Sequence, residues 1–262
     1  MTLVPPCGST GYFALLAAEL CNGGPGGSEC SRVVAIEPSA PTMARLRENL
    51  SLNPTLARRV RAVQLAAAEA AGELTLYENR REPLYTTTVA GAGAGGVAAS
   101  ADVWSVLQSN MPAMAQAGVA ASAVAALADE GVWRSARVRS APLDEILTDE
   151  ERACARVIKI DVEGGEWDVI RGMSRTLAEA RPDLELVIEL TPRWLRMQGV
   201  SAASVIRHMH DAGYHAYVLR EDYEIRHAFG PTAGRPRRLP LGKPLGCEQA
   251  DVIFSHVDAE WL

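Results

Sequence analysis

Three acidic side chains come directly after a short apolar segment in the middle of the chain. Val157–Ile160 is rich in branched residues, which is typical of a buried strand, and Asp161, Glu163 and Glu166 follow it. In open α/β sheets, ligands bind just outside the carboxyl ends of the strands. Because carboxylates crowded together there lose hydration and repel one another, they usually have a polar, cationic or metal partner. The segment therefore indicates a ligand site. The alternative is a set of acids that only favours the dipole of the next helix.

A fourth carboxylate, Glu189, ends the next predicted strand, 184–190. Since the carboxyl ends of parallel strands meet at one edge of a sheet, we expect Glu189 to face the same cleft as Asp161. A hydroxyl nucleophile needs a base that accepts its proton. The candidates are Asp161, Glu163, Glu189 and His210. Clustered carboxylates also suit Mg²⁺, which prefers oxygen ligands, but nothing in the spacing requires a metal. The alternatives are that Glu163 caps the following helix and that His210 is an ordinary helix residue.

A second candidate site lies near the start of the chain, where glycines precede the first predicted helix. Gly8, Ser9 and Gly11 form a turn of the kind that lets a ligand approach backbone amides. Glu37 then ends the next predicted strand, 32–36. A carboxylate in that place can accept hydrogen bonds from both ribose hydroxyls of an adenosine. The turn and the acid together predict nucleoside binding.

The glycine pattern separates two adenosine-containing cofactors. A dinucleotide needs room for a pyrophosphate and usually a full GxGxxG, and only Gly8 and Gly11 are present. S-adenosylmethionine has no phosphate and carries a sulfonium cation, which suits an acidic site near Asp161. We therefore expect S-adenosylmethionine, and an NAD-dependent enzyme is the less favoured alternative.

The composition limits the class of protein. Of the 262 residues, 48% are hydrophobic, which is enough for one α/β domain with a sizeable core. The net charge of −6 argues against a nucleic-acid partner, since phosphate binding needs a basic surface, and the short basic run Arg235–Arg238 is expected to be a solvated loop. The sequence has no apolar run of about 18 or more residues and no secretory signal, so we expect a cytoplasmic protein without a membrane partner. The five cysteines include no CxxC pair, which argues against zinc.

Predicted strands and helices alternate along most of the chain, which is typical of a doubly wound, mostly parallel α/β sheet. The predicted strands cover residues 32–36, 60–65, 73–77, 157–160, 184–190, 214–219 and 251–255, and the predicted helices cover 11–20, 41–52, 143–147, 167–180 and 201–212. The loop between the last two strands has no helical pattern, which favours an antiparallel pairing. A mostly parallel sheet with one antiparallel strand near the C-terminus is the layout of Rossmann-like class I methyltransferases.

One segment, at about 80–137, does not fit this alternation. It begins with a Gly/Ala-rich run at 90–96 and contains two stretches with a helical pattern, 102–108 and 119–128. Long insertions in compact domains often form lids or binding loops. We therefore expect a single domain, 1–262, with a lid-like insertion, and the alternative is a disordered surface segment.

With these segments in order, the chain resembles the FkbM family of S-adenosylmethionine-dependent methyltransferases. The most specific match is Ile158–Gly164, with the sequence IKIDVEG. Further matches are Gly11–Ala18, Val34–Pro38, Arg45–Leu50, Gly72–Leu74, Leu143–Leu147, Val187–Glu189 and Asp251–Phe254. The resemblance implies methyl transfer from S-adenosylmethionine to an oxygen or, in some members, to a nitrogen.

The resemblance also implies roles for individual residues. Cofactor contacts are expected from Gly8, Ser9, Gly11, Glu37, Ala66 and Asp161, and catalytic roles from Asp161, Glu163 and Glu189. The expected acceptor is a small molecule, such as a sugar, a polyketide or another secondary metabolite. The low charge and the apolar helices of the insertion permit a homodimer.

The motif of the first strand departs from the family pattern. Family members usually have an acidic residue followed by Gly-x-Asn-x-Gly, whereas this chain has Pro5, Pro6, Cys7, Gly8, Ser9 and Thr10. The acid is absent, and prolines interrupt the strand. A catalytically impaired relative that serves as a binding module is therefore the alternative to an active enzyme.

Overall fold

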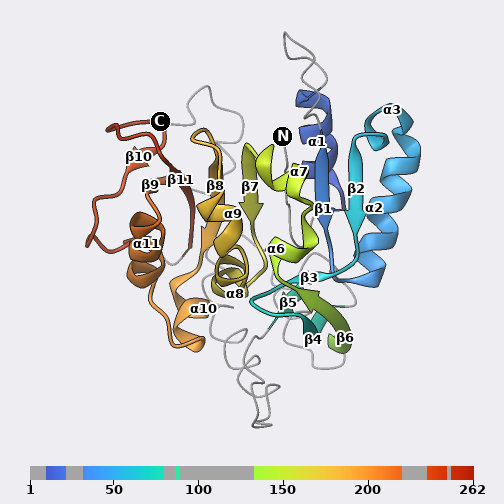
Figure 1. The fold of residues 1–262 in the computed structure, drawn as a ribbon. Helices are drawn as coiled ribbons and strands as arrows, with labels where there is room; N and C mark the ends of the chain where they lie inside the picture. Colours follow the sequence, from blue (N-terminus) through green and yellow to red (C-terminus); the bar gives the residue numbers. More distant parts are fainter. Residues whose placement is uncertain (1–9, 22–31, 80–85, 89–132, 220–234, 247–248) are drawn as a thin grey trace, which may run out of the picture.

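The computed structural model describes residues 10–21, 32–79, 86–88, 133–219, 235–246 and 249–262 (Figure 1). The strands of these residues form three sheets, with two, five and four strands. None of the helices in the described ranges is long and apolar enough to cross a membrane.

The first sheet consists of two parallel strands near the start of the chain. β1 (Val33–Ile36) pairs with β2 (Val60–Val63). α1 (Tyr12–Leu20) contacts both strands, and α2 (Ala40–Leu52) and α3 (Pro54–Ala57) connect them. These elements agree with the strand–helix alternation that the sequence predicts.

The second sheet has the strand order β10-β9-β11-β8-β7. β7 (Val157–Ile160) and β8 (Glu185–Leu190) are parallel. β11 (Ala250–Ser255) runs antiparallel to both β8 and β9 (His215–Val218), as the non-helical loop before it predicts. The short β10 (Arg237–Arg238) is also antiparallel to β9, so this sheet has two reversed strands where the sequence predicts one.

The third sheet lies outside the predicted layout. Its strands are β3 (Ala66–Ala67), β6 (Trp133–Ala141), β4 (Gly72–Asn79) and β5 (Thr86–Thr88), and β4 is antiparallel to both β5 and β6. β5 and the start of β6 fall within the expected insertion. The expectation of one sheet is therefore wrong for the described residues. The sequence of β6, WRSARVRSA, consists mainly of small and basic residues, so it lacks the hydrophobic alternation that reveals a strand.

The remaining described helices follow β6 along the chain. They are α6 (Leu143–Ile146), α7 (Asp149–Ala153), α8 (Glu166–Arg171), α9 (Ser174–Ala178), α10 (Pro192–Met197) and α11 (Ala202–Asp211). The helical stretches predicted at 102–108 and 119–128 lie outside the described residues.

The single helix predicted at 167–180 is two helices, α8 and α9, and the chain makes a close contact at Gly172, where α8 ends. A Cβ atom at this position would lie 2.0 Å from the carbonyl oxygen of Ala68. The side chain of Asp144 then accepts hydrogen bonds from the backbone N–H groups of Arg175 and Thr176, both at 2.8 Å. The start of α9 is thus fixed by a residue about thirty positions earlier in the chain, which no local pattern reveals.

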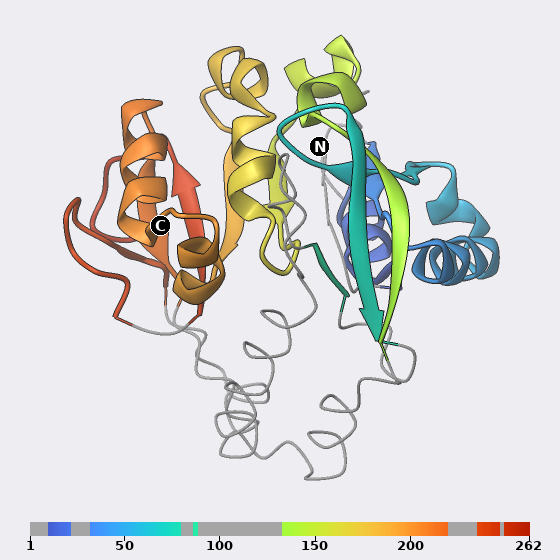
Figure 2. The same ribbon diagram turned by 90° about the horizontal axis from the view of Figure 1, so that it is seen from below.

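Helices cover both faces of the strands. In β1, Val33 and Ala35 pack with α1 and α2, whereas Val34 and Ile36 belong to the larger core with β8 and α11. Val157 of β7 also packs against the first cluster. Seen from below, the orange α11 and the yellow α8 lie along one side of the five-stranded sheet (Figure 2). β1 and β7 therefore share both cores and bring their carboxyl ends to one region.

Candidate active site

Asp161, Glu163 and Glu189 lie together at the carboxyl ends of β7 and β8. One carboxylate oxygen of each residue lies within 4.8 Å of the others. The parallel register pairs Ile160 with Ile188, so the residues that follow these two reach the same edge of the sheet. The structure thus brings together the three carboxylates that the sequence predicts as catalytic, and their roles remain predictions.

Lys159 supplies a positive charge inside this cluster. Its ammonium group donates a hydrogen bond to Asp161, because side chains two residues apart on a strand leave the same face. The Lys159 Nζ atom also lies 5.0 Å from the ring centre of Phe13 on α1, within cation–π range. Lys159 therefore joins the acidic end of β7 to the helix near the predicted cofactor turn.

The turn after β7 has a constrained backbone. Glu163 has a φ of 51°, which is uncommon for a residue with a side chain. Gly164 has a φ of 109°, and a Cβ atom there would lie 3.3 Å from the Trp194 ring of α10. The side-chain amide of Gln198 donates to the Gly164 carbonyl. The glycine of the IKIDVEG segment is thus required both by its backbone angle and by its contact with α10.

Glu166 stabilises this turn. Its side chain is 1% exposed, and Oε1 accepts hydrogen bonds from the backbone N–H groups of Gly164, at 3.0 Å, and Val162, at 3.2 Å. Its Oε2 has no hydrogen-bond partner in the described part of the chain. Burial raises the pKa of Glu166 to about 7, although the two N–H groups favour the ionised form. Glu166 therefore accepts hydrogen bonds within the turn at the start of α8, which agrees with the alternative that this acid serves the following helix.

Burial also raises the pKa values of the three clustered carboxyls. The pKa of Glu189 is raised to about 7 by burial and by the charge of Asp161. Burial and the charges of Glu189 and Asp161 raise the pKa of Glu163 well above its usual value. Burial raises the pKa of Asp161 as well, against the opposing effect of Lys159. Groups that gain or lose a proton near neutral pH are suited to acid–base chemistry and cluster at functional sites.

Two further polar residues, which are not among the predicted site residues, reach the cluster from β11 and from the residue before this strand. Gln249 donates its side-chain N–H to Oε1 of Glu189. Asp251 stands opposite Glu189 in the β8–β11 register, and its charge raises the pKa values of Glu189 and Asp161. Asp251 begins a segment that resembles the family, whereas Gln249 has no signal in the sequence.

Glu37 and Gly11 lie at the ends of elements, as the sequence predicts. Glu37 follows β1, and its backbone N–H donates to the carbonyl of Val63 at 3.0 Å. Its buried Oε1 accepts from the N–H of Ser39 at 2.7 Å, just before α2 begins. Gly11 precedes α1 with a φ of 98°, and a Cβ atom there would lie 2.7 Å from Leu46 of α2. The positive φ favours glycine at this position, and a larger residue would also require the end of the Leu46 side chain to move.

The other predicted cofactor residues are less defined. Ala66 is buried on β3, where it pairs with Ser140 of β6, and Gly8 and Ser9 lie outside the described residues. The carbonyl of Thr10 accepts a hydrogen bond from the Asn49 side chain at 2.6 Å, which ties the turn to α2. The cofactor contacts of these residues remain predictions.

His210 does not join the acidic cluster. It lies on α11 and lines a cavity beside β9 and β10, where its ring is 6.0 Å from that of His215. Because β9 starts at His215, this cavity is at the amino edge of the parallel strands, opposite the carboxylates. The structure therefore contradicts His210 as a candidate base.

One family model matches most of the chain. The model of the methyltransferase FkbM domain matches residues 26–216. Among solved structures, the chain is similar to the methyltransferase FkbM from Methylobacillus flagellatus KT, with 15% identity, a TM-score of 0.47, and coverage of 97% of this chain and 42% of that one. It is also similar to the precorrin-6y C5,15-methyltransferase from Geobacter metallireducens GS-15, with 12% identity, a TM-score of 0.39, and coverage of 97% and 78%.

No curated protein matches the chain. The chain spans less than half the length of the Methylobacillus protein. The family model, by contrast, covers more than half of the present sequence and includes the IKIDVEG segment, Glu37 and Glu189. This chain therefore belongs to the FkbM methyltransferase family and has an α/β methyltransferase fold.

Proposed function

We propose that the protein transfers a methyl group from S-adenosylmethionine to an oxygen atom of a small-molecule acceptor, such as a sugar, a polyketide or another secondary metabolite. Membership of the family supports methyl transfer. The observation that carries the finer proposal is the group of Asp161, Glu163 and Glu189, whose carboxylate oxygens lie within 4.8 Å at the carboxyl ends of two parallel strands. Such a group suits a cationic ligand and a proton acceptor in one place.

The residues fit an adenosyl cofactor with a positive charge. Buried Glu37 at the end of β1 offers carboxylate oxygens to ribose hydroxyls, and Asp161 at the end of β7 offers negative charge to the sulfonium or the amino group. β1 and β7 share both hydrophobic cores. We therefore infer that the cofactor lies across the carboxyl ends of β1 and β7, where the two-stranded and five-stranded sheets share their hydrophobic cores.

The proposed reaction is an in-line displacement. When bound, S-adenosylmethionine would supply a methyl group on a sulfonium sulfur, so that an oxygen–carbon bond would form as the carbon–sulfur bond breaks and a neutral thioether leaves. Glu189 takes the hydroxyl proton, since its pKa of about 7 suits a base at neutral pH and Gln249 fixes the orientation of its carboxylate. Asp161, which is held by Lys159, would face the positive charge of the cofactor. Positioning of this kind can supply up to about 7–11 kcal/mol of the barrier reduction in favourable systems.

A divalent cation such as Mg²⁺ is a second ligand that the cluster could hold. The support is the spacing of the three carboxylates, since Mg²⁺ takes oxygen ligands and usually one or two carboxylates. Mn²⁺ titration followed by electron paramagnetic resonance tests this. Binding that Asp161→Asn removes and Asp183→Asn leaves unchanged supports a metal in the cluster, whereas binding that survives Asp161→Asn excludes it.

Calorimetric titration with S-adenosylmethionine and S-adenosylhomocysteine tests the main proposal. We expect micromolar binding to the intact chain, at least tenfold weaker binding to Glu37→Ala, and unchanged binding to Glu48→Ala, which alters an exposed acid on α2. Absence of binding by the intact chain would favour the second candidate, a catalytically impaired binding module. The support for this candidate is the sequence at Pro5–Thr10, which departs from the family pattern. Analysis of the methylated product separates an oxygen acceptor from the nitrogen alternative.

A further inference from the structure

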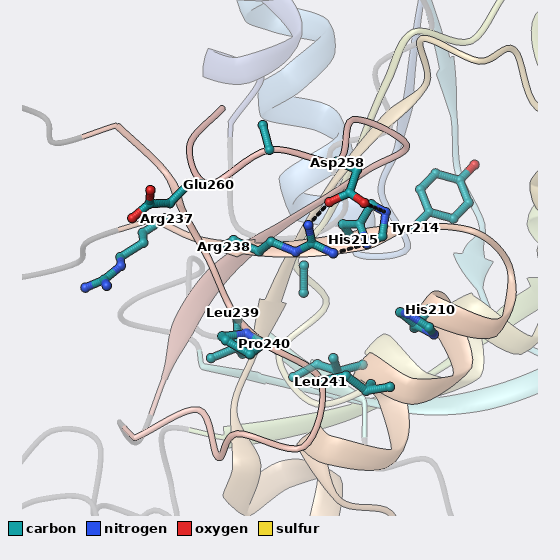
Figure 3. A pocket seen from close by; sticks show the side chains of 13 residues that line it. His210, Tyr214, His215, Arg237, Arg238, Leu239, Pro240, Leu241, Asp258 and Glu260 are labelled. Atoms are coloured by element: carbon teal, nitrogen blue, oxygen red, sulfur yellow. Dashed lines mark hydrogen bonds and ion pairs between the residues drawn. The ribbon is translucent and has the colours of Figure 1, made fainter.

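A cavity of about 630 Å³ lies beside β9 and β10, at the edge of the sheet opposite the acidic cluster (Figure 3). Its walls come from α11, from the start of β9, from β10 and the residues after it, and from the C-terminal segment. The volume is in the range of small-molecule sites, about 300–1,000 Å³. The cavity shares no residue with the proposed methyl-transfer site.

One wall of the cavity is an ordered polar group centred on Arg238. One terminal nitrogen of its guanidinium pairs with Asp258, and the other donates to Nδ1 of His215 at 2.8 Å. Because Nδ1 accepts this hydrogen bond, the His215 ring is neutral, and burial and the charge of Arg238 lower the pKa of His215. With both terminal nitrogens engaged, Arg238 offers a ligand chiefly its flat face, which is the surface that stacks on aromatic rings.

Another wall is apolar. Figure 3 shows Leu239, Pro240 and Leu241 below Arg238 in this view, and His210 on α11 at the other side of the cavity. The Leu241 side chain is 48% exposed although it lines the cavity. A guanidinium on one wall and aliphatic side chains on another are surfaces on which a planar ring can pack.

The formal charges of the lining residues balance. Arg237 and Arg238 contribute two positive charges, and Asp258 and Glu260 contribute two negative charges. Arg237 lies over the ring of Trp261, with its guanidinium carbon 5.5 Å from the ring centre, and Asp258 is engaged by Arg238. With these charges balanced and Arg238 paired with Asp258, the lining has no net charge that would attract a charged ligand, so a neutral ligand is favoured.

Hydrogen bonds hold the walls in place without a ligand. The hydroxyl of Tyr217 donates to the carbonyl of Val257 at 2.5 Å and accepts from the N–H of Ala259 at 3.0 Å, which fixes Asp258 between them. The backbone N–H of Arg238 donates to the carbonyl of Glu260 at 3.0 Å. The cavity is therefore preformed, which reduces the entropic cost of binding.

We propose that this cavity is a second ligand site, which binds a neutral, planar aromatic small molecule between the guanidinium face of Arg238 and the side chains of Leu239 and Leu241. The site is independent of the methyl-transfer proposal, because it stands at the opposite edge of the sheet and its occupancy requires no cofactor.

The test uses the full chain without cofactor and two probes with the same carbon skeleton. Calorimetry or protein-observed NMR compares 2-naphthol, which is planar and aromatic, with decahydro-2-naphthol, which is neither. We expect 2-naphthol to bind at least fivefold more tightly, with NMR shifts at residues 237–241 and 258–260. Equal binding of the two probes, or shifts confined to other residues, would overturn the proposal.

Matched variants locate the probe. Ala259→Phe places a ring in the cavity and should weaken 2-naphthol binding at least tenfold. Val257→Phe is the control, because Val257 is two residues away, is exposed and does not line the cavity; its affinity for 2-naphthol should stay within twofold of that of the unaltered protein. Arg238→Lys keeps the charge opposite Asp258 but removes the planar face, so it should abolish the preference for the planar probe. Thermal unfolding checks that each variant is folded. If the folded Arg238→Lys variant still binds 2-naphthol more tightly than decahydro-2-naphthol, the proposal that the ligand stacks on Arg238 is wrong.

Discussion

Glu189 on β8 and Asp251 on β11 stand opposite each other in an antiparallel register, so two carboxylates share one face of the sheet. Like charges placed opposite each other on neighbouring strands are destabilising. Burial and the charge of Asp161 raise the pKa of Glu189 most, and the charge of Asp251 adds to them. A strand that is distant in sequence thus shifts the protonation of the candidate base toward neutral pH.

Replacement of Glu189 by glutamine should remove the base while keeping the size of the side chain. We expect the turnover number to fall about 10²–10⁴-fold, the usual contribution of a positioned acid or base. Activity of the unaltered protein should decline as the pH falls below about 7, because Glu189 becomes protonated, and the variant should lack this decline. Transfer of labelled methyl to a panel of hydroxylated acceptors measures both effects.

Glu185→Gln is the matched control, since Glu185 is at the other end of β8, where it accepts a hydrogen bond from Ser255 at 3.4 Å. Its turnover should be within twofold of the unaltered protein. Equal turnover of Glu189→Gln and Glu185→Gln would exclude Glu189 as the base.

Replacement of Glu166 by glutamine should change how stability depends on pH. Since the pKa of Glu166 is about 7 in the folded protein and 4.5 ordinarily, the folded state alone holds the proton between these values. The free energy of unfolding should therefore fall as the pH rises from about 4.5 to 7. Glu166→Gln, which still accepts the two backbone hydrogen bonds, should be more stable than the unaltered protein at pH 8 by about 2–3 kcal/mol, because the rise of the Glu166 pKa from 4.5 to about 7 is worth roughly 1.4 kcal/mol per pH unit, and close to it in stability at pH 5.

Urea unfolding at the two pH values measures this difference. Glu150→Gln, at an exposed position on α7, provides the control and should show the same pH dependence as the unaltered protein. A Glu166→Gln variant that is equally destabilised at both pH values would show that the ionised form is the stable one.

Lys159→Met should leave Asp161 without its internal counter-ion. Lys159 and Asp161 are 13% and 22% exposed, so we expect a loss of about 1–3 kcal/mol, somewhat below the cost of breaking a fully buried pair. A cationic cofactor can take over part of the role of Lys159. S-adenosylmethionine should therefore raise the melting temperature of Lys159→Met more than that of the unaltered protein.

The control is Arg156→Met, which removes a partner of Asp183 from a more exposed ion pair. This change should cost about 0–1 kcal/mol, as is usual for surface pairs, and should leave the effect of the cofactor unchanged. Identical melting shifts for both variants would contradict a shared electrostatic role of Lys159 and the cofactor.

Gly164→Ala should destabilise the turn that carries Glu163. The positive φ of 109° and the 3.3 Å approach of Trp194 act together, and we expect a loss of about 2–4 kcal/mol. Gly199→Ala separates the two causes, because Gly199 also has a positive φ, 72°, but nothing lies within 4 Å of its Cβ position. That variant should lose only about 1–2 kcal/mol. Equal losses would mean that the Trp194 contact has no energetic weight.

The sequence by itself determined the local features of the site. Apolar residues followed by Asp161 and Glu163 indicate a buried strand that ends in acids, and Glu37 after Val33–Ile36 follows the same rule. These features could be read because side-chain alternation, glycine angles and helix caps depend on residues within a few positions of one another. The family assignment has the same basis, since it rests on short segments in a fixed order.

Only the tertiary structure decided which distant residues meet. Gln249 and Asp251 reach Glu189 through the β8–β11 register, β6 joins β4 despite its polar sequence, and Asp144 starts α9. The cavity at Arg238 likewise requires elements from three parts of the chain. Such contacts depend on strand register and on burial that many elements share. Because the energy of each contact depends on several distant segments, no single segment of the sequence predicts it.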